Sequence, residues 1–194
     1  LYIVGTPIGN LSDITLRALD VLKGVDYIAC EDTRVTRKLL DHYKIDKPLI
    51  SYLSQSSFSK IEKIVFLLGE GKDIALVSDA GTPTISDPGS FLVSKVRELL
   101  QEVKVVAIPG PSALTTALSV SGLSVSDFLF LGFLPHKKGR ETLFKEIKES
   151  KRTVVFYESV HRFIATLSKL NELIDPERKV VVCRELTKIY EEVI

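Results

Sequence analysis

The chain has 194 residues, 45% of them hydrophobic, which is enough for one large domain or two small ones with real cores. Its 26 basic and 25 acidic residues nearly cancel, which argues against a protein that coats nucleic acid through a broad positive field. No apolar run approaches the roughly 20 residues that span a bilayer, so no membrane partner is expected, and no signal peptide is visible. A local basic patch remains compatible with this balance.

The two cysteines, Cys30 and Cys183, both lie in apolar runs of strand character. This placement favours buried thiols in a reducing compartment, here the cytoplasm, over a disulfide. The three histidines, His42, His136 and His161, lack metal-ligand spacing, and no metal site is predicted. Because the chain begins in an apolar run without Met and ends in another, we expect further residues at both ends, more of them at the second.

Apolar runs and amphipathic runs alternate along the chain, which predicts an α/β fold. Strands are expected at 1–4, 27–30, 49–53, 74–78, 103–108, 128–133, 153–157 and 179–184, with a further strand opening in 189–194. Helices are expected at 13–23, 33–43, 57–68, 88–100, 112–121, 141–148 and 160–173. Ser12 or Asp13 is the expected N-cap of the first helix. The basic segment 134–140 is typical of a linker, and we divide the chain into domains 1–122 and 123–194.

Four turn-rich loops directly follow apolar runs in the first 113 residues: Gly5–Asn10, Glu31–Arg34, Ser78–Pro83 and Pro109–Ala113. Because an α/β sheet gathers ligand-binding loops at the carboxyl ends of its strands, these loops predict one ligand site. The first is neither GxGxxG nor a Walker motif, and Pro7 removes a backbone donor, so a plain tight turn is the alternative there. In the fourth, Ser112 and free N–H groups suit an oxygen-rich ligand, with N-capping by Ser112 as the alternative.

Charged side chains concentrate in the second and third loops. Glu31, Asp32 and Arg34 share one strand end, where either a catalytic role or helix capping by Asp32 with an Arg34 ion pair explains them. Asp79 and Asp87 in the third loop suit hydrogen bonds from ribose hydroxyls or an amine, with Asx-turns as the alternative. No Ser/His/Asp arrangement is evident, and Ser112 is not in a nucleophile elbow.

Taken together, six motifs resemble the family of ribosomal RNA small subunit methyltransferase I, within the tetrapyrrole methylase superfamily. The resemblance spans essentially the whole chain, in order. Its motifs are Gly5-Thr6-Pro7-Ile8-Gly9-Asn10, Glu31-Asp32-Thr33-Arg34, Ser78-Asp79-Ala80-Gly81-Thr82-Pro83, Pro109-Gly110-Pro111-Ser112-Ala113, Phe156-Tyr157-Glu158-Ser159 and Arg184-Glu185-Leu186-Thr187-Lys188. Residues 51–57 depart from the family pattern, because they contain no acid or His.

The resemblance implies two α/β domains of the tetrapyrrole methylase type, with the active site in the cleft between them. It implies S-adenosylmethionine as the methyl donor and a homodimer. The implied reaction is methylation of a ribose 2′-hydroxyl on a cytidine in the decoding region of small-subunit (16S) ribosomal RNA, within an assembled or nearly assembled subunit. The alternatives are a tetrapyrrole or protein side-chain methyltransferase of the same fold, or a non-catalytic nucleotide-binding or ribosome-assembly module.

The resemblance also assigns residues to roles. The positions that match the donor-binding loops and the strand end that closes over the donor are Pro7, Ser78, Asp79, Ala80, Ser112, Ala113, Phe156 and Tyr157. Because a ribose hydroxyl is a poor nucleophile, a nearby base would help, and the catalytic candidates are Glu31, Asp32, Arg34, Glu158, Glu185 and Lys188. A local patch for RNA phosphates is expected from Lys137, Lys138, Arg140, Arg162, Arg184 and Lys188.

Overall fold

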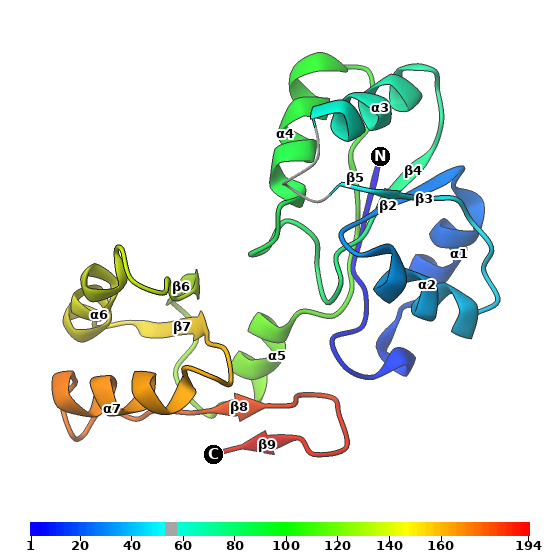
Figure 1. Cartoon of the computed structure of the whole chain (residues 1–194). Helices are drawn as coiled ribbons and strands as arrows, with labels where there is room; N and C mark the ends of the chain where they lie inside the picture. The colour runs from blue at the N-terminus through cyan, green and yellow to red at the C-terminus, as the bar shows by residue number, and fades with distance from the viewer. Residues whose placement is uncertain (53–57) are drawn as a thin grey trace. The chain divides into compact units, whose positions relative to one another are not determined.

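The computed structural model describes residues 1–52 and 58–194, and the expected strand end and helix start within 53–57 lie outside this description (Figure 1). The described residues form two compact units, Leu1–Ala113 with Glu185–Ile189, and Leu114–Arg184 with Tyr190–Ile194. The sequence boundary after residue 122 falls later than this division. Helix α5 (Ala113–Val120) belongs to the second unit beyond its first residue, and there the Cys183 thiol lies 3.9 Å from the Ala117 carbonyl oxygen.

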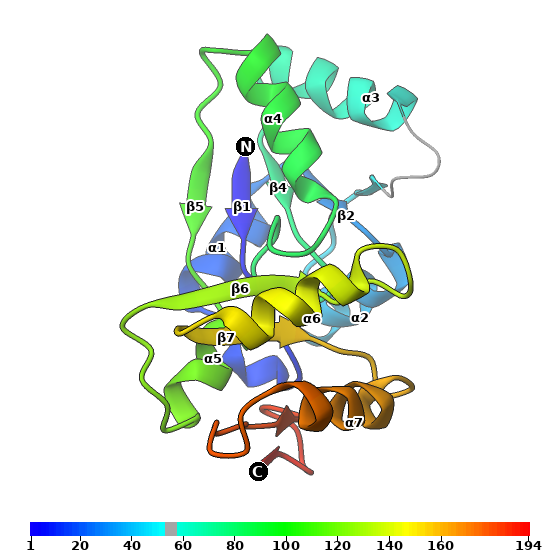
Figure 2. The ribbon, with the colours of Figure 1, turned by 90° about the vertical axis from the view of Figure 1, so that its left-hand side faces the viewer.

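The first unit is built on five parallel strands in the order β3-β2-β4-β1-β5. The strands are β1 (Tyr2–Val4), β2 (Tyr27–Cys30), β3 (Leu49–Ser51), β4 (Ile74–Leu76) and β5 (Val106–Ile108). Figure 2 shows β1, β4 and β5 running in one direction, so their carboxyl ends meet at one edge. The helices between the strands are α1 (Leu16–Gly24), α2 (Thr33–His42), α3 (Phe58–Gly69) and α4 (Gly89–Leu99).

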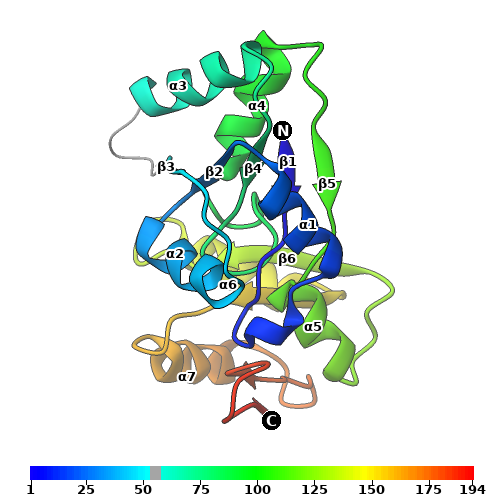
Figure 3. The same ribbon diagram turned by 90° about the vertical axis from the view of Figure 1, so that its right-hand side faces the viewer.

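Alternate residues of the central strands pack against different helices, as the period of two in a strand requires. Val4, Ile28 and Ala75 join the core cluster under α1 and α2. Ala29 and Leu76 join the cluster under α3 and α4. The unit therefore has three layers. Helix α4 lies in front of the sheet in Figure 2, and α1 and α2 lie in front of it in Figure 3.

Strand β4 lies between β1 and β2, and its following helix leaves to the opposite face from theirs. The chain passes from β1 to α1 and from β2 to α2 on one face, whereas it passes from β4 to α4 on the other. Loops that diverge in this way open a crevice at the carboxyl ends of the strands, which is where ligands of open α/β sheets bind. The topology thus points to the loops after β1, β2 and β4.

Helix α1 begins later than the sequence predicts, and the prediction of Ser12 or Asp13 as its N-cap is wrong. Leu11–Asp13 instead form a short 3-10 turn, in which the Asn10 side chain accepts a hydrogen bond from the Ser12 N–H. Thr15 caps α1, because its hydroxyl accepts a hydrogen bond from the Ala18 N–H at 3.0 Å. The turn extends the loop after β1 before the helix starts.

The second unit has a parallel pair, β6 (Phe128–Phe133) and β7 (Thr153–Tyr157), and an antiparallel pair, β8 (Cys183–Arg184) and β9 (Glu192–Val193). Helices α6 (Arg140–Glu149) and α7 (Phe163–Leu173) cover one face of β6–β7 around Leu134, Phe144, Ile147 and Leu170. The strands expected at 179–184 and within 189–194 are only two residues long each, and α7 starts at Phe163 rather than Val160.

Both cysteines are free thiols. No helix in residues 1–52 and 58–194 is long and apolar enough to cross a membrane.

Candidate active site at the strand ends

A backbone clasp joins the loops after β1 and β4. Thr6 and Gly81 exchange two backbone hydrogen bonds, of 2.9 and 3.0 Å. The buried Thr6 hydroxyl donates to the Ser78 carbonyl oxygen at 3.1 Å, and the Ser78 hydroxyl donates to the Gly81 carbonyl oxygen at 3.2 Å. The Ser78 side chain is therefore engaged within its own loop, and only the backbone of Ser78 is left for the predicted contact with the donor.

The loops after β1 and β5 approach each other more closely than side chains would allow. A Cβ on Gly5 would lie 2.8 Å from the Gly110 Cα, and a Cβ on Gly110 would lie 2.9 Å from the Gly5 carbonyl oxygen. The Thr82 hydroxyl also donates to the Pro111 carbonyl oxygen at 3.1 Å, which ties the third loop to the fourth. The predicted donor-binding positions Pro7, Asp79, Ala80, Ser112 and Ala113 therefore lie on interlocked loops at one sheet edge.

The loops after β2 and β4 hold each other through their acids. The Asp79 N–H donates to Glu31 Oε1 at 3.2 Å, and the Asp32 N–H donates to Asp79 Oδ1 at 3.0 Å. This reciprocal pairing places the Glu31 and Asp79 carboxylates beside the crevice predicted by the topology. It leaves each carboxylate with further acceptor positions, because an ionised carboxylate has about four.

Burial raises the pKa of Glu31 above its ordinary value. The hydrogen bond from the Asp79 N–H opposes this shift, and the negative charges of Asp79 and Asp87 add to it. Burial also raises the pKa of Asp87, whose Oδ1 accepts a hydrogen bond from the Gly89 N–H at 2.7 Å. This is the Asx-turn alternative for Asp87. A carboxylate with a raised pKa is a stronger base, which sets Glu31 apart among the candidates.

Asp32 has the opposite environment. It caps α2 through a 2.8 Å hydrogen bond from the Arg34 N–H, and the Arg34 Nε donates to the same oxygen at 3.0 Å. The hydrogen bonds from the Arg34 side chain and backbone lower the pKa of Asp32 to about 2. The capping alternative is confirmed for Asp32, which is a weak base, while the Arg34 side chain stays 86% exposed.

The segment Glu185–Ile189 belongs to the first unit, where it packs on the loop after β1. A Cβ on Gly9 would lie 2.6 Å from Lys188 Cγ and 2.7 Å from Thr187 Oγ1. Glu185 and Thr187 have left-handed φ angles of 55° and 69°, which are uncommon for residues other than glycine. The structure therefore brings two predicted catalytic residues to the first loop, and they pair with each other, with Lys188 Nζ 3.1 Å from Glu185 Oε2.

In the second unit, Phe156 and Tyr157 face opposite sides of β7, as consecutive strand residues do. Phe156 packs against the core under α6 and α7, so only its backbone is left for the predicted role in donor binding. The Tyr157 ring lies 5.2 Å from the Phe130 ring and 5.1 Å from the Phe133 ring. Burial raises the pKa of Tyr157, which keeps its hydroxyl protonated.

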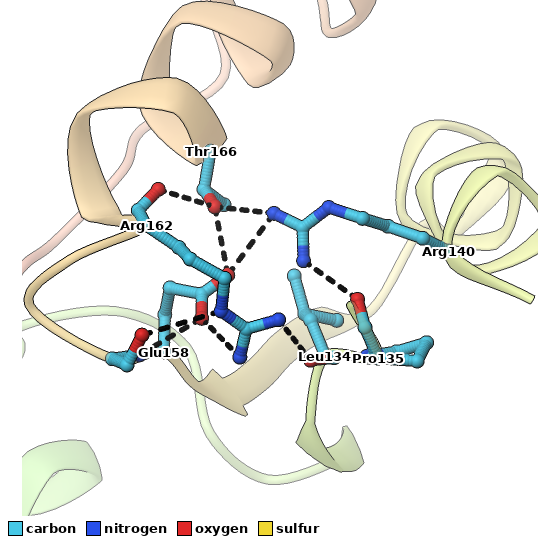
Figure 4. A network of polar contacts seen from close by, with 7 residues as sticks. Leu134, Pro135, Arg140, Glu158, Arg162 and Thr166 are labelled. Carbon is cyan, nitrogen blue, oxygen red and sulfur yellow. Dashed lines mark hydrogen bonds and ion pairs between the residues drawn. The ribbon is translucent and has the colours of Figure 1, made fainter. Parts of the chain in front are cut away.

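Glu158 is the centre of a polar network (Figure 4). Arg162 Nη2 lies 2.7 Å and the Ser159 N–H 2.8 Å from Oε1, while Arg140 Nη2 lies 3.0 Å and the Thr166 hydroxyl 2.7 Å from Oε2. Burial alone raises the pKa of Glu158, but the hydrogen bonds from Thr166, Ser159 and Arg140 and the charge of Arg162 outweigh it and leave the pKa lowered. With its side chain 5% exposed and its oxygens engaged, Glu158 suits a structural role better than that of a base.

Several of these contacts carry little signal in the sequence. Thr6 and Thr82 lay within recognised motifs, but only their loop neighbours were candidates. Their hydroxyl groups beside Gly and Pro were the available cue, because Thr often closes turns with backbone carbonyls.

Among the described residues, no three His, Cys, Asp or Glu side chains are placed to hold a metal ion. None of these loops lines the hollow of about 550 Å³ beside Arg97 and Lys104 or the one of about 610 Å³ beside Lys145 and Arg152.

The family model described as Tetrapyrrole (Corrin/Porphyrin) Methylases matches residues 1–194. The chain belongs to the tetrapyrrole methylase family. A relative named "Ribosomal RNA small subunit methyltransferase I" from Thermotoga maritima is 50% identical over 192 residues, which cover 99% of this chain and 85% of the relative. A relative of the same name from Vibrio cholerae is 52% identical over 192 residues, covering 98% of this chain and 66% of its own length.

Solved structures agree on the fold of this tetrapyrrole methylase family member. The methyltransferase CobJ superposes with a TM-score of 0.73 at 19% identity, over 100% of this chain and 84% of that one. Diphthine synthase superposes with a TM-score of 0.71 at 16% identity, over 99% of this chain and 79% of that one. At these identities the likeness shows the α/β fold of the tetrapyrrole methylases and no more.

Family membership implies S-adenosylmethionine as the methyl donor. The first unit offers a matching set of groups. Its glycine turns bring the loops after β1 and β5 together, because a Cβ on Gly5 or Gly110 would meet the backbone of the other loop. The exposed Asp79 carboxylate at the same sheet edge suits the amine or ribose hydroxyls of the donor. The residues present therefore fit this donor.

Proposed function

We propose that this chain carries out S-adenosylmethionine-dependent methylation of the ribose 2′-oxygen of a cytidine in the decoding region of small-subunit (16S) ribosomal RNA, within an assembled or nearly assembled subunit and as a homodimer. Relatives about 50% identical that are named for small-subunit ribosomal RNA support the RNA substrate. The cytidine, its 2′-oxygen and the homodimer rest on the family resemblance. The observation that carries the chemistry is the reciprocal pairing of Glu31 and Asp79 at the sheet edge.

The donor-holding residues in this proposal are Pro7, Asp79, Ala80, Ser112 and Ala113. S-adenosylmethionine supplies an electrophilic methyl group on a sulfonium. The Asp79 carboxylate, exposed and fixed by the Asp32 N–H, is placed to accept hydrogen bonds from donor hydroxyl or amine groups. The two hydrogen bonds between Thr6 and Gly81 hold this loop in position, so that the loop loses little conformational entropy when the donor binds.

Glu31 is the proposed general base. A ribose hydroxyl is a poor nucleophile, and a base that accepts its proton as the new O–C bond forms contributes about 100- to 10,000-fold in rate. The O–H bond of the 2′-hydroxyl breaks and its proton passes to a Glu31 carboxylate oxygen, while the methyl group would leave the donor sulfur, whose electron pair remains on the released thioether. The Asp79 N–H orients that carboxylate, and its burial keeps it more basic than an exposed glutamate. The paired Glu185 and Lys188 then serve as neighbours that position the first loop.

Arg34 is the proposed RNA contact of the first unit. Its side chain is 86% exposed at the start of α2, beside the Glu31 loop, and only its Nε and Nη2 pair with Asp32, which leaves Nη1 for a second partner. An exposed guanidinium of this kind binds phosphate oxygens in two-pronged geometry. Replacing Arg34 by Ala is expected to leave donor affinity unchanged in calorimetry and to abolish methylation of RNA in a turnover assay. Equal turnover would remove Arg34 from the proposal.

The decisive experiment incubates the full-length protein with methyl-labelled S-adenosylmethionine and small ribosomal subunits that lack the modification, and then maps the label to a nucleotide and an atom. Label on a decoding-region ribose 2′-oxygen is expected, and Glu31→Gln is expected to lose it while keeping donor affinity. Asp79→Ala is expected to lose donor affinity itself. Donor binding without label on RNA would overturn the proposed substrate and favour a tetrapyrrole or protein substrate.

A further inference from the structure

Two of the basic residues expected to contact RNA phosphates are committed elsewhere. The side chains of Arg140 and Arg162 are only 15% and 20% exposed, and both guanidinium groups pair with Glu158. Arg140 also lies over the Phe144 ring, 5.0 Å from its centroid. The expectation that these two arginines form part of a phosphate patch is therefore not supported, because their donors already point into the unit.

These same arginines hold the segment that follows β6. Arg162 Nη1 donates to the Leu134 carbonyl oxygen at 2.9 Å, and Arg140 Nη1 donates to the Pro135 carbonyl oxygen at 3.0 Å (Figure 4). Arg140 also begins α6, directly after the segment. Residues 135–139, which we call the lysine loop, are thus fixed at both ends, and Glu158 holds both of the side chains that fix them.

Such a network needs a reason beyond stability. Removing charged groups from water is costly, and well-packed hydrophobic residues often stabilise a fold as well as a buried ion pair does. What the ions add is directional bonding, since a guanidinium fork fixes both its carboxylate and a carbonyl oxygen. In this unit the directional bonds end on Leu134 and Pro135, so the part they fix is the lysine loop.

Lys137 and Lys138 stand at the middle of the lysine loop. Both are exposed, and neither forms an ion pair with any residue in the described part of the chain. By contrast, Arg184 pairs with Glu192 at 2.8 Å and Lys188 pairs with Glu185 at 3.1 Å, so their charges are already offset. Gly139, with a φ of 85°, ends the loop in a conformation suited to glycine.

We propose that the lysine loop is a preset RNA-phosphate contact and that Glu158 is its positioning residue rather than a base. The RNA partner rests on the proposed function. Lysine amines held on a fixed loop bind phosphate oxygens with less ordering cost than those on a free loop. Each phosphate neutralised releases counterions, so log K falls with log salt by about 0.7 for single strands and about 0.9 for duplex per contact.

The first test measures binding of the full-length protein to unmodified small ribosomal subunits across a salt series. The double variant Lys137→Ala/Lys138→Ala is expected to reduce the salt slope by about 1 to 2. The matched control, Lys148→Ala/Lys151→Ala, removes the same charge from two exposed lysines at the end of α6 that form no ion pair among the described residues, and it is expected to keep the slope. An unchanged slope in the first variant, or an equal fall in both, would overturn the proposal.

The second test addresses Glu158 through its partner, because Glu158→Gln leaves two largely buried guanidinium groups without a counter-charge and so changes the stability of the unit together with any effect on binding. Arg140→Lys keeps the positive charge but has no fork to reach both Glu158 and Pro135. This variant is expected to weaken subunit binding and raise KM several-fold while kcat at saturating subunits and donor affinity stay unchanged. A fall in kcat with KM unchanged would instead place the Glu158 network in the chemistry.

These readouts separate the two proposals. If the lysine loop alters the salt slope but no label reaches RNA, the loop contact stands and the proposed methylation fails. If label reaches the 2′-oxygen with the same salt slope in all variants, the methylation stands and the loop contact fails. Binding is measured without donor in the first test, so its outcome does not depend on transfer.

Discussion

Gly5→Ala tests whether the loops after β1 and β5 are interlocked by backbone approach. Gly5 is buried and does not have a left-handed φ, so alanine suits its conformation and only space is changed. The added Cβ would lie 2.8 Å from Gly110 Cα, 3.1 Å from its nitrogen and 3.3 Å from its carbonyl carbon. All three are backbone atoms, which have no rotamer through which to move away.

The size of the effect follows from those distances. Ordinary van der Waals contact begins at 3.4 Å, so the strands must separate by about 0.6 Å at this point. They are tied there by a 3.2 Å hydrogen bond from the Gly5 N–H to the Ile108 carbonyl oxygen. Overpacking of this kind costs about 1–3 kcal/mol. For a chain of this length each kcal/mol lowers the melting temperature by about 2–4 °C, so a fall of about 2–12 °C is expected.

The assay is calorimetric melting of the full-length variant, followed by titration with S-adenosylmethionine at a temperature where it is folded. Donor affinity is expected to fall as well, because the displaced loops carry the proposed donor site. Gly24→Ala is the matched control, since its Cβ meets nothing within 4 Å at the end of α1. If Gly5→Ala melts like Gly24→Ala and keeps full donor affinity, the reasoning about interlocked loops is refuted.

Three further predictions follow from the acids and from the first loop. The rate of methylation is expected to rise with pH as Glu31 loses its proton. Asp87→Asn is expected to shift that rise to lower pH, because it removes one of the negative charges that raise the pKa of Glu31. A pH–rate profile that does not move in this variant would contradict the prediction. Glu158 has a lowered pKa, so its contribution to stability is present above the unfolded value near 4.3 and is lost as pH falls through the folded value. Melting temperatures between pH 6 and 3 are therefore expected to fall less steeply in Glu158→Gln than in the wild type. Gly9→Ala is expected to displace residues 185–189, measured as faster amide exchange there, whereas unchanged exchange would show that Lys188 moves aside freely.

The sequence predicted the repeated strand–loop–helix order well because each element carries its own signal. The apolar run at 27–30 and the capping acid Asp32 set the end of β2 and the start of α2 without help from distant residues. The predicted start of α1 is wrong because Asn10 and Thr15 both offer capping oxygens, and a short 3-10 turn followed by a helix uses both, whereas one longer helix would not. The short strands β8 and β9 likewise depend on pairing between residues that the apolar pattern alone does not align.

Contacts between distant segments decided what the sequence left open at the candidate site. The pattern identified the loop residues but not the order of strands in the sheet, and this order is what places the Asp79 loop beside Glu31. The packing of residues 185–189 on Gly9 joins positions almost the whole chain apart, and no local periodicity encodes it. The only cue to this close approach was that position 9 is a glycine, which has no side chain to keep another segment away.

Glu31 and Glu158 show why position at a strand end does not by itself assign a role. Both follow a parallel strand, β2 or β7, and both are withdrawn from water. Glu31 has acids as its charged neighbours, so burial dominates and its pKa rises. Glu158 meets two arginines and a threonine hydroxyl, so its charge is stabilised and its pKa falls. A base must be able to take up a proton readily, whereas a tether must keep its charge, and these neighbours support the proposed role of base for Glu31 and of positioning residue for Glu158.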